Sequence, residues 1–440
     1  LNYQSPDEPL RLILEANRSE SMLLPGEAYT KIKCGLERDR LYKIIRNQGY
    51  FDFKADNIHF SIDTSDKERI SGLLNDPFSQ ALNYKPNTEH NSLDVKVQIR
   101  PSRDSNYALA YHIQDVKVDI ISPDDELLPM PQKTESDLDD VHFSYVTLPV
   151  NRKVITRNIF IHQGDLFNTR DFEITVNRLN QLGVFQFVNI RYEKVEGKTG
   201  ELRCLITLHT APRFDLVGVT DLSTSDDDYL LGTGLGITFR NRNLFHGANN
   251  GSFRASYSTE FRNDEFLTGN RTFYQSGNNV NLNLNLTFPK FIVPFNQNVF
   301  SKKNMPYTQL GATYSFIRRI QNYTLINISG NFGYSWQETQ RKNWHVYPVF
   351  LTVTQVPEKF LGATFKEKLL TNEFLRKTFS NHVIQGENML FEYRKQGKGR
   401  NSNLQSLKLG LEEAGTVLKG VNWLYNKFSH DSISAIANYI

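Results

Sequence analysis

From residue 214 onward the sequence alternates between apolar and polar side chains in one segment after another. The clearest segment is "VNLNLNLTF", in which Val280, Leu282, Leu284 and Leu286 fall on one face and asparagines on the other. A period of two residues is typical of a β-strand with one apolar and one polar face. We count about nine such segments between residues 214 and 414, with a further candidate at 433–440, so this half is predicted to be an antiparallel sheet.

The polar face of these segments favours one kind of sheet over another. It carries Asn, Ser, Gly, Thr and Gln with two charges, Arg254 and Glu260, which suit a water-filled interior. The apolar face has aromatic residues near the segment ends, among them Tyr334, Trp336 and Tyr347, as membrane interfaces do. A transmembrane β-barrel is therefore favoured over a soluble sandwich.

The outer face of such a barrel would contact lipid. The residues predicted to do so are Val280, Leu282, Leu284, Leu286, Tyr334 and Trp336. The mean hydropathy of −0.48 is low, and no apolar run is long enough for a transmembrane helix, which needs roughly 18 residues. A barrel strand needs only about ten alternating residues, and a sheet in lipid must close to pair its backbone groups.

The first half of the chain contains an internal repeat. Residues 43–62 and 178–195 each read as a helix, a glycine (Gly49 or Gly183), an aromatic residue and then a strand. Glycine ends helices because it adopts the left-handed conformation without strain. We interpret each copy as part of a small β-α-α-β-β domain, and the polar, turn-rich stretch 64–92 as an insertion or linker.

Catalytic and metal-binding motifs are missing from the sequence, so the protein is not expected to be an enzyme, and no cofactor or metal is expected. Cys34 and Cys204 are expected to be unpaired packing residues. Three consecutive carboxylates in "TSDDDYL", residues 224–230, are interpreted as a solvated loop, with a Ca²⁺ or lipopolysaccharide-bridging role as the alternative. The net charge of +3 gives no reason to expect a nucleic-acid partner.

These features together resemble a known family. The "GYFDF" and "GVFQF" units are similar to POTRA domains, and "GLGITFRNRNLFHGANNGSFRASY" is similar to the first barrel hairpins of the BamA/TamA outer-membrane assembly superfamily. The resemblance is greatest to the TamA-like, lipoprotein-type branch. It implies periplasmic α+β POTRA domains followed by an antiparallel transmembrane barrel of sixteen strands, of which only about the first half is in this sequence. The implied division is an incomplete N-terminal segment at 1–26, POTRA domains at 27–104 and 105–212, and the start of the barrel at 213–440.

The resemblance also implies how such a protein works. A client outer-membrane protein would be inserted, without ATP, at a lateral gate between the first and last barrel strands, and the POTRA domains would dock clients or a periplasmic partner such as a TamB-like protein. The implied location is the bacterial outer membrane. The implied lateral-gate strand contains Phe214, Leu216, Val217, Gly218 and Val219, with Gly218 opening a kink. The implied POTRA edge strands contain Phe187, Ile190, Tyr192, Ile58 and Phe60. The implied periplasmic hairpin turn contains Asn243, Leu244, Phe245 and Gly247.

Alternative functions stay open at this point. A two-partner-secretion transporter shares the same domains, but would be favoured by a long lumen-plugging N-terminal helix that is not visible here. A non-insertase anchor for a periplasm-spanning lipid-transfer protein, or a passive porin, are further alternatives. Residues 357–380 form either a surface helix or an ordinary long loop, and the basic stretches "RRIQ" and "QRKN" are either solvated turns or contacts for lipid phosphate.

Overall fold

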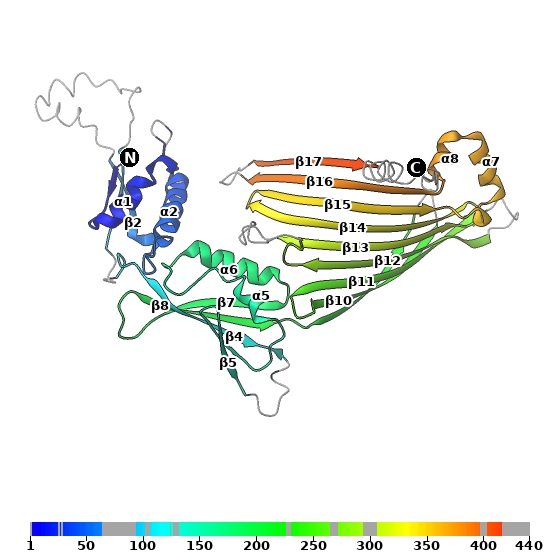
Figure 1. The fold of residues 1–440 in the computed structure, drawn as a ribbon. Coiled ribbons are helices and arrows are strands. Elements are labelled where there is room, and N and C mark those ends of the chain that lie inside the picture. Colours follow the sequence, from blue (N-terminus) through cyan, green and yellow to red (C-terminus); the bar gives the residue numbers. More distant parts are fainter. Residues whose placement is uncertain are drawn as a thin grey trace, which may run out of the picture.

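The computed structural model describes residues 2–24, 27, 30–63, 94–101, 106–123, 125, 132–225, 230–264, 272–293, 306–396 and 403–415. Two α/β domains are followed by one large antiparallel sheet (Figure 1). No helix in these ranges is long and apolar enough to cross a membrane. The predicted insertion at 64–92, the carboxylates of residues 226–228 and the candidate strand at 433–440 lie outside the described residues.

The first domain has the predicted β-α-α-β-β order. Its elements are β1 (Asn2–Gln4), α1 (Glu8–Ala16), α2 (Lys31–Arg46), β2 (Ile58–Asp63) and β3 (Asp94–Ile99). The sheet order is β1-β3-β2, with β1 parallel to β3. Leu10 and Leu14 of α1 are fully buried in the same core as Leu41 and Ile45 of α2. The predicted separate segment at 1–26 is therefore wrong, because its first strand and helix complete this domain.

The second domain repeats this order and adds a hairpin after its first strand. Its elements are β4 (His112–Ile121), β5 (Thr134–Leu138), β6 (Val141–Tyr145), α5 (Arg152–Thr156), α6 (Thr169–Gln181), β7 (Phe185–Lys194) and β8 (Glu201–Thr210). The sheet order is β5-β6-β4-β8-β7. The inward residues of β8, such as Leu202, Ile206 and Leu208, are buried against the helices.

The glycine repeat marks the ends of the two longer helices. Gly49 and Gly183 have φ values of 97° and 68°, which L-residues rarely adopt, and they follow α2 and α6. The two copies then differ. Phe185 starts β7 directly, whereas Phe51 lies in a turn and the next strand begins only at Ile58.

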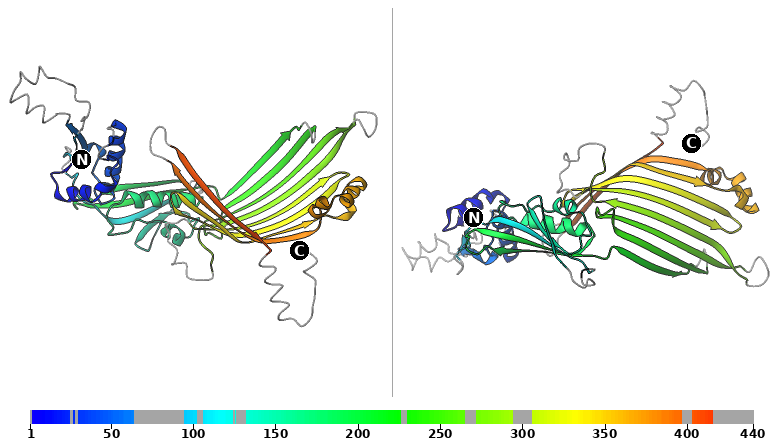
Figure 2. Two further views of the ribbon diagram at one scale, coloured as in Figure 1. Left: turned by 90° about the horizontal axis from the view of Figure 1, so that it is seen from above. Right: turned by 60° about the horizontal axis from the view of Figure 1, so that its bottom comes forward.

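The remaining strands form a single sheet of nine, as the alternation predicted. They are β9 (Phe214–Ser223), β10 (Leu231–Leu244), β11 (Asn249–Asp264), β12 (Thr272–Phe288), β13 (Tyr307–Arg319), β14 (Tyr323–Thr339), β15 (Lys342–Gln355), β16 (His382–Gln396) and β17 (Leu404–Ala414). Each strand pairs with its sequence neighbour, and the sheet curves without closing (Figure 2). Two helices, α7 (Ala363–Thr371) and α8 (Glu373–Thr378), lie between β15 and β16, so the segment 357–380 is helical in part.

The register places the predicted lipid-facing residues in one apolar layer. Leu282 pairs with Ala255 and Tyr314, and Val280 pairs with Tyr257 and Phe316. The same layer reaches Trp336, which pairs with Trp344. We call this the apolar face.

The opposite face is polar and its side chains are crowded. Ser315 donates to Asn281 at 2.8 Å, and Thr313 donates to Asn283 at 3.0 Å, so hydroxyls and amides link neighbouring strands. A Cβ added to Gly333 would lie 2.3 Å from the ring of Tyr347. Crowding of this kind is expected on the concave side of a curved sheet. Tyr347 therefore lies on the polar face, and its predicted place among the interfacial aromatics is wrong.

Candidate functional site: the open edge of the sheet and the joint beside it

Strand β9, predicted to be the lateral-gate strand, forms one edge of the large sheet. It pairs with β10 from Phe214 to Ser223, and its other side has no partner strand among the described residues. The pairing contains no bulge, and Gly218 pairs with Ile237 in regular register. The predicted kink at Gly218 is therefore wrong, although a side chain there would meet nothing within 4 Å.

The hydrogen-bond pattern shows which backbone groups of β9 face the open side. Arg242 N–H donates to the Arg213 carbonyl at 2.9 Å, which marks these two residues as a hydrogen-bonded pair. Bonded and non-bonded pairs alternate along an antiparallel ladder, so Val217 and Val219 bond to β10. The N–H and C=O groups of Leu216 and Gly218 then point away from β10. These are the groups that an added strand would use.

The start of β9 is held more firmly than its far half. Asp215 forms an ion pair with Arg242 at 2.6 Å and lies 3.8 Å from Arg240. The ring of Phe214 stacks on Phe239 with centroids 5.7 Å apart. No ion pair or ring contact of this kind is found in the described residues of β9 beyond Asp215. Among the described residues, ion pairs and ring contacts therefore hold only the start of the edge strand.

The turn after β10 joins the large sheet to the second domain. Asn243 is 4% exposed, and its side-chain amide donates to the Pro149 carbonyl at 2.5 Å. Its side-chain oxygen accepts from Ala248 N–H at 3.0 Å. Asn151 N–H in turn donates to the His246 carbonyl at 2.9 Å. Ala248 is itself part of the second domain's hydrophobic core.

The backbone of this turn is unusual. Phe245, His246 and Ala248 have φ values of 58°, 54° and 55°, the left-handed region that costs L-residues about 1–2 kcal/mol each. The hydrogen bonds of Asn243 offset part of that cost. The predicted turn residues therefore divide by role: Asn243 is a buried clamp, Leu244 covers Gly251 in the next strand, and the ring of Phe245 is 81% exposed.

A second contact connects the sheet to helix α6. The Tyr307 hydroxyl donates to the side-chain oxygen of Gln181 at 3.3 Å. Arg178, one turn earlier on α6, is 5% exposed, and burial lowers the pKa of its guanidinium. The second domain thus touches the sheet at β10–β11 and at β13.

The two strands predicted as POTRA edges both lie at sheet edges. Strand β7 is the edge of the second sheet and β2 is the edge of the first. Their side chains are not equivalent. Phe187 is 62% exposed, whereas Ile190 and Ile58 are buried in their own cores. Only the backbone of these strands and outward side chains such as Phe187 are accessible to a partner.

Of the remaining edge residues, Phe60 packs against the core of the first domain, and Tyr192 contributes to the contact between the two α/β domains. Tyr192 packs with Phe51 and Phe167, at centroid distances of 6.0 and 5.1 Å. The guanidinium of Arg46 lies 4.8 Å from the ring of Phe167. Burial raises the pKa of Tyr192. This aromatic cluster, which we call the interdomain cluster, was not predicted, because its members are far apart in sequence.

An ion pair also stabilises the contact between the two α/β domains. Lys194 lies 2.9 Å from Asp52, and the Tyr111 hydroxyl donates to the same carboxylate at 2.5 Å. The hydrogen bond to Asp52 raises the pKa of Lys194. The Tyr111 backbone N–H also donates to the Gly49 carbonyl at 2.9 Å. Because backbone, charge and ring contacts coincide, the two domains form one firmly joined unit.

The polar face carries a charge pair that spans three strands. Glu260 on β11 and Arg319 on β13 are 3.0 Å apart, and between them Gly277 on β12 leaves room for the arginine. Arg254, the other charge predicted for this face, lies in the same layer as Asn283.

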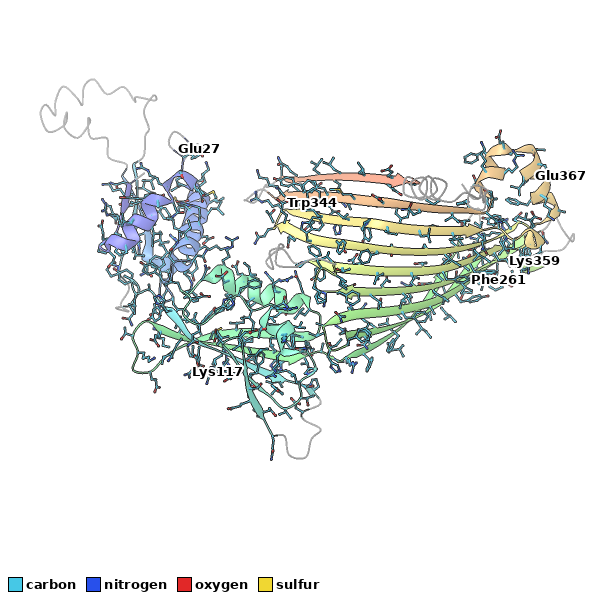
Figure 3. All side chains as sticks on the ribbon, viewed as in Figure 1. Glu27, Lys117, Phe261, Trp344, Lys359 and Glu367 are labelled. Atoms are coloured by element: carbon cyan, nitrogen blue, oxygen red, sulfur yellow. The ribbon has the colours of Figure 1, made fainter. Side chains whose placement is uncertain are left out.

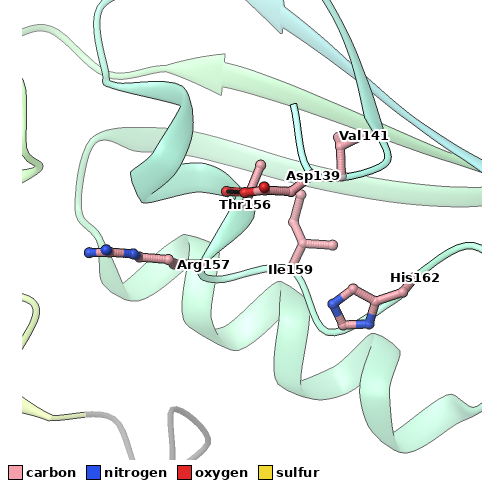
Figure 4. Close-up of a pocket in the computed structure, with 6 residues that line it drawn as sticks. All are labelled: Asp139, Val141, Thr156, Arg157, Ile159 and His162. Carbon is pink, nitrogen blue, oxygen red and sulfur yellow. Dashed lines mark hydrogen bonds between the residues drawn. The ribbon is translucent and has the colours of Figure 1, made fainter. Parts of the chain in front are cut away.

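The described residues contain no cluster of three or more metal-ligating side chains. A pocket of about 320 Å³ lies in the second domain beside Asp139, which accepts a hydrogen bond from Thr156 at 3.2 Å (Figure 4). Arg157 and His162 lie on opposite sides of it and do not converge (Figure 4).

Several solved structures resemble this chain in fold, with low TM-scores and low sequence identity. No protein-family model matches the chain, and no curated protein matches it. BamA from Haemophilus ducreyi lacking POTRA domains 1–3 matches with 11% identity and a TM-score of 0.44, covering 94% of this chain and 63% of that one. CdiB from Escherichia coli matches with 10% identity and a TM-score of 0.32, covering 93% and 67%. CdiB from Acinetobacter baumannii matches with 10% identity and a TM-score of 0.30, covering 94% and 68%. All these TM-scores lie below 0.5, so they do not by themselves establish a family.

Proposed function

We propose that this protein is an outer-membrane assembly factor of the BamA/TamA type, which templates the strands of client proteins at the open edge of β9. The observation that carries the proposal is that edge. Along this regular strand, the N–H and C=O groups of Leu216 and Gly218 point away from β10 and meet no other strand of the described residues. Such a row accepts an incoming strand by β-addition, and the energy comes from backbone hydrogen bonds and not from a chemical step.

The rest of the sheet supports a location in the bacterial outer membrane. The apolar face, including Leu282 and Leu284, suits contact with lipid, and the polar face suits water. The two β-α-α-β-β domains then belong in the periplasm, beside the turn at Asn243. In this arrangement the edges of β7 and β2 are docking strands for clients or for a periplasmic partner, including a TamB-like one.

The contact between the second domain and the turn after β10 connects docking in the periplasm to the open edge. The clamp at Asn243 ties the second domain to the β10–β11 hairpin, and β10 is the only described partner of β9. A movement of the second domain would therefore displace β10, and through β10 it would displace the open edge of β9. Docking in the periplasm and opening of the edge would be coupled in this way.

The test is site-specific photo-crosslinking in cells that are synthesising outer-membrane proteins. A photoreactive phenylalanine analogue is placed at Leu216 or Thr220 on the open edge, and at Leu284 in the centre of the apolar face as the matched control. Adducts with nascent outer-membrane proteins are expected from the two edge positions and not from Leu284.

Three other outcomes would contradict the proposal. Equal adducts at all three positions would mean that clients only pass near the protein in the membrane. Adducts from the polar face, with the analogue at Asn283, and none from the edge would favour a transporter that passes its substrate through the lumen. An absence of client adducts at every position would favour an anchor without insertase activity.

A further inference from the structure

The end of the large sheet remote from the α/β domains carries an ordered cap. It consists of residues 356–381, which include α7 and α8, and it contacts the tip of the β13–β14 hairpin (Figure 1). Gly362 N–H donates to the Asn322 carbonyl at 2.9 Å. Tyr323 packs against Phe365 and Phe379, at centroid distances of 5.2 and 4.6 Å. These contacts fix both the start and the end of the cap relative to the sheet.

The cap places one aromatic ring close to two cations. The guanidinium of Arg318 lies 5.6 Å from the centroid of Phe360, and the ammonium of Lys359 lies 4.9 Å from it. All three side chains are exposed, with Phe360 at 41%. Neither cation forms an ion pair with a carboxylate of the described residues, and this includes Glu358, the sequence neighbour of Lys359. A cation–π contact at an exposed site is worth only about 0.5–1 kcal/mol, so both charges stay available.

The register shows where these cations stand relative to the apolar face. Arg318 pairs with Thr324, and two residues earlier Phe316 pairs with Ile326. Arg318 is therefore the last residue of an apolar-face row, just beyond Tyr314 and Phe316. Lys359 lies at the same end of the sheet, opposite the end that carries Trp344 (Figure 3).

We propose that Arg318, Lys359 and Phe360 bind the phosphate-bearing headgroup of an anionic membrane lipid. The proposal rests on the membrane orientation proposed above, in which the apolar face meets acyl chains and its far end meets headgroups. Cations on long side chains at the end of an apolar surface are placed to contact lipid phosphate. The aromatic ring that both cations contact supplies an apolar platform for the glycerol and upper acyl region.

The test is native mass spectrometry of the detergent-purified protein titrated with phosphatidylglycerol, and in parallel with zwitterionic phosphatidylcholine. The wild type is expected to prefer phosphatidylglycerol. Arg318→Gln and Lys359→Gln should each weaken that binding about fivefold, the factor expected for one basic residue near an anionic lipid surface. Phe360→Leu should weaken binding of both lipids. The matched control is Lys366→Gln together with Lys368→Gln, which removes two exposed charges from α7 and should change affinity less than twofold.

The outcomes separate this proposal from the proposed function. A wild type without preference for the anionic lipid, or a control pair that weakens binding as much as the site pair, would overturn the lipid site. Full displacement of the lipid by inorganic phosphate at equal concentration would overturn it too, because a free anion would then suffice. Failure of the protein to insert into bilayers, checked first by nanodisc reconstitution, would instead contradict the membrane orientation itself.

Discussion

The clamp at Asn243 leads to a quantitative prediction for the substitution Asn243→Ala. The side chain makes two hydrogen bonds, to the Pro149 carbonyl and from the Ala248 N–H, each worth about 1 kcal/mol net. Its removal also leaves the N–H of Ala248, which is 2% exposed, without an acceptor, at a cost of about 1–3 kcal/mol. In the tautomer with the proton on Nδ1, His246 still donates to the Pro149 carbonyl at 3.0 Å, so this carbonyl keeps one hydrogen bond in the variant. We expect the turn to lose about 2–4 kcal/mol of local stability.

Hydrogen–deuterium exchange of the peptide covering residues 243–250 measures this loss directly. Because about 1.4 kcal/mol corresponds to a factor of ten, amide exchange in the turn should accelerate roughly 30- to 700-fold. The control is Phe245→Ala, which truncates an exposed ring in the same turn and should leave exchange unchanged. Exchange in Asn243→Ala within threefold of the wild type would refute the idea that this side chain holds the joint.

Three further predictions concern the sheet and the two domains. Gly333→Val should destabilise the sheet by about 1–3 kcal/mol, measured by urea unfolding, because any Cβ there overlaps the ring of Tyr347. Glu37 is buried, which raises its pKa, but the hydrogen bonds and charge of Arg40 outweigh burial and lower that pKa below its ordinary value of 4.5. The stability that this pair contributes is present above about pH 4.5 and is lost as the pH falls further, and Glu37→Gln should remove that part of the acid dependence in unfolding measured between pH 3 and 7. Burial raises the pKa of Cys204 to about 12, so iodoacetamide at pH 8 should leave this thiol unmodified until the protein unfolds, as read by mass spectrometry.

Each of these three has an outcome that would contradict it. Gly330 has no atom closer than 3.8 Å to an added Cβ, so Gly330→Val should be much milder, and equal losses at both glycines would remove the steric explanation. An acid dependence that persists unchanged in Glu37→Gln would assign it to other groups. Rapid alkylation of folded Cys204 would mean that the core around it opens readily.

The strands and their two faces were predictable because period-two alternation is a local property. Val280 to Leu286 alternate without interruption, and the structure keeps them in one layer. Tyr347 was misassigned because it lies three residues after Trp344, so that strict alternation itself places the two on opposite faces. The alternation breaks only beyond it, where the register shifts between Tyr347 and Phe350. No feature of the local sequence predicts such a shift in register.

Contacts between distant segments were not predictable in the same way. Strand β1 has only three residues, too few for a periodic pattern, and its partner β3 begins at Asp94. Phe51 aligns with Phe185 in the repeat, yet it packs against Tyr111 and Phe167 of the neighbouring domain. The burial of Ala248 also depends on how the turn after β10 packs against the core of the second domain. A single alanine in the sequence does not predict that packing.

The open edge of β9 has a consequence for handling the protein. Exposed edges of soluble sheets are usually guarded by lysine, proline, a bulge or a covering loop, which discourage pairing with another molecule. The ten residues of β9 contain no lysine and no proline, and their register is unbroken. Leu216 and Leu222 are 73% and 80% exposed. A preparation of this chain without a closing strand should therefore self-associate edge to edge, and a short synthetic peptide that occupies β9 should keep it monomeric.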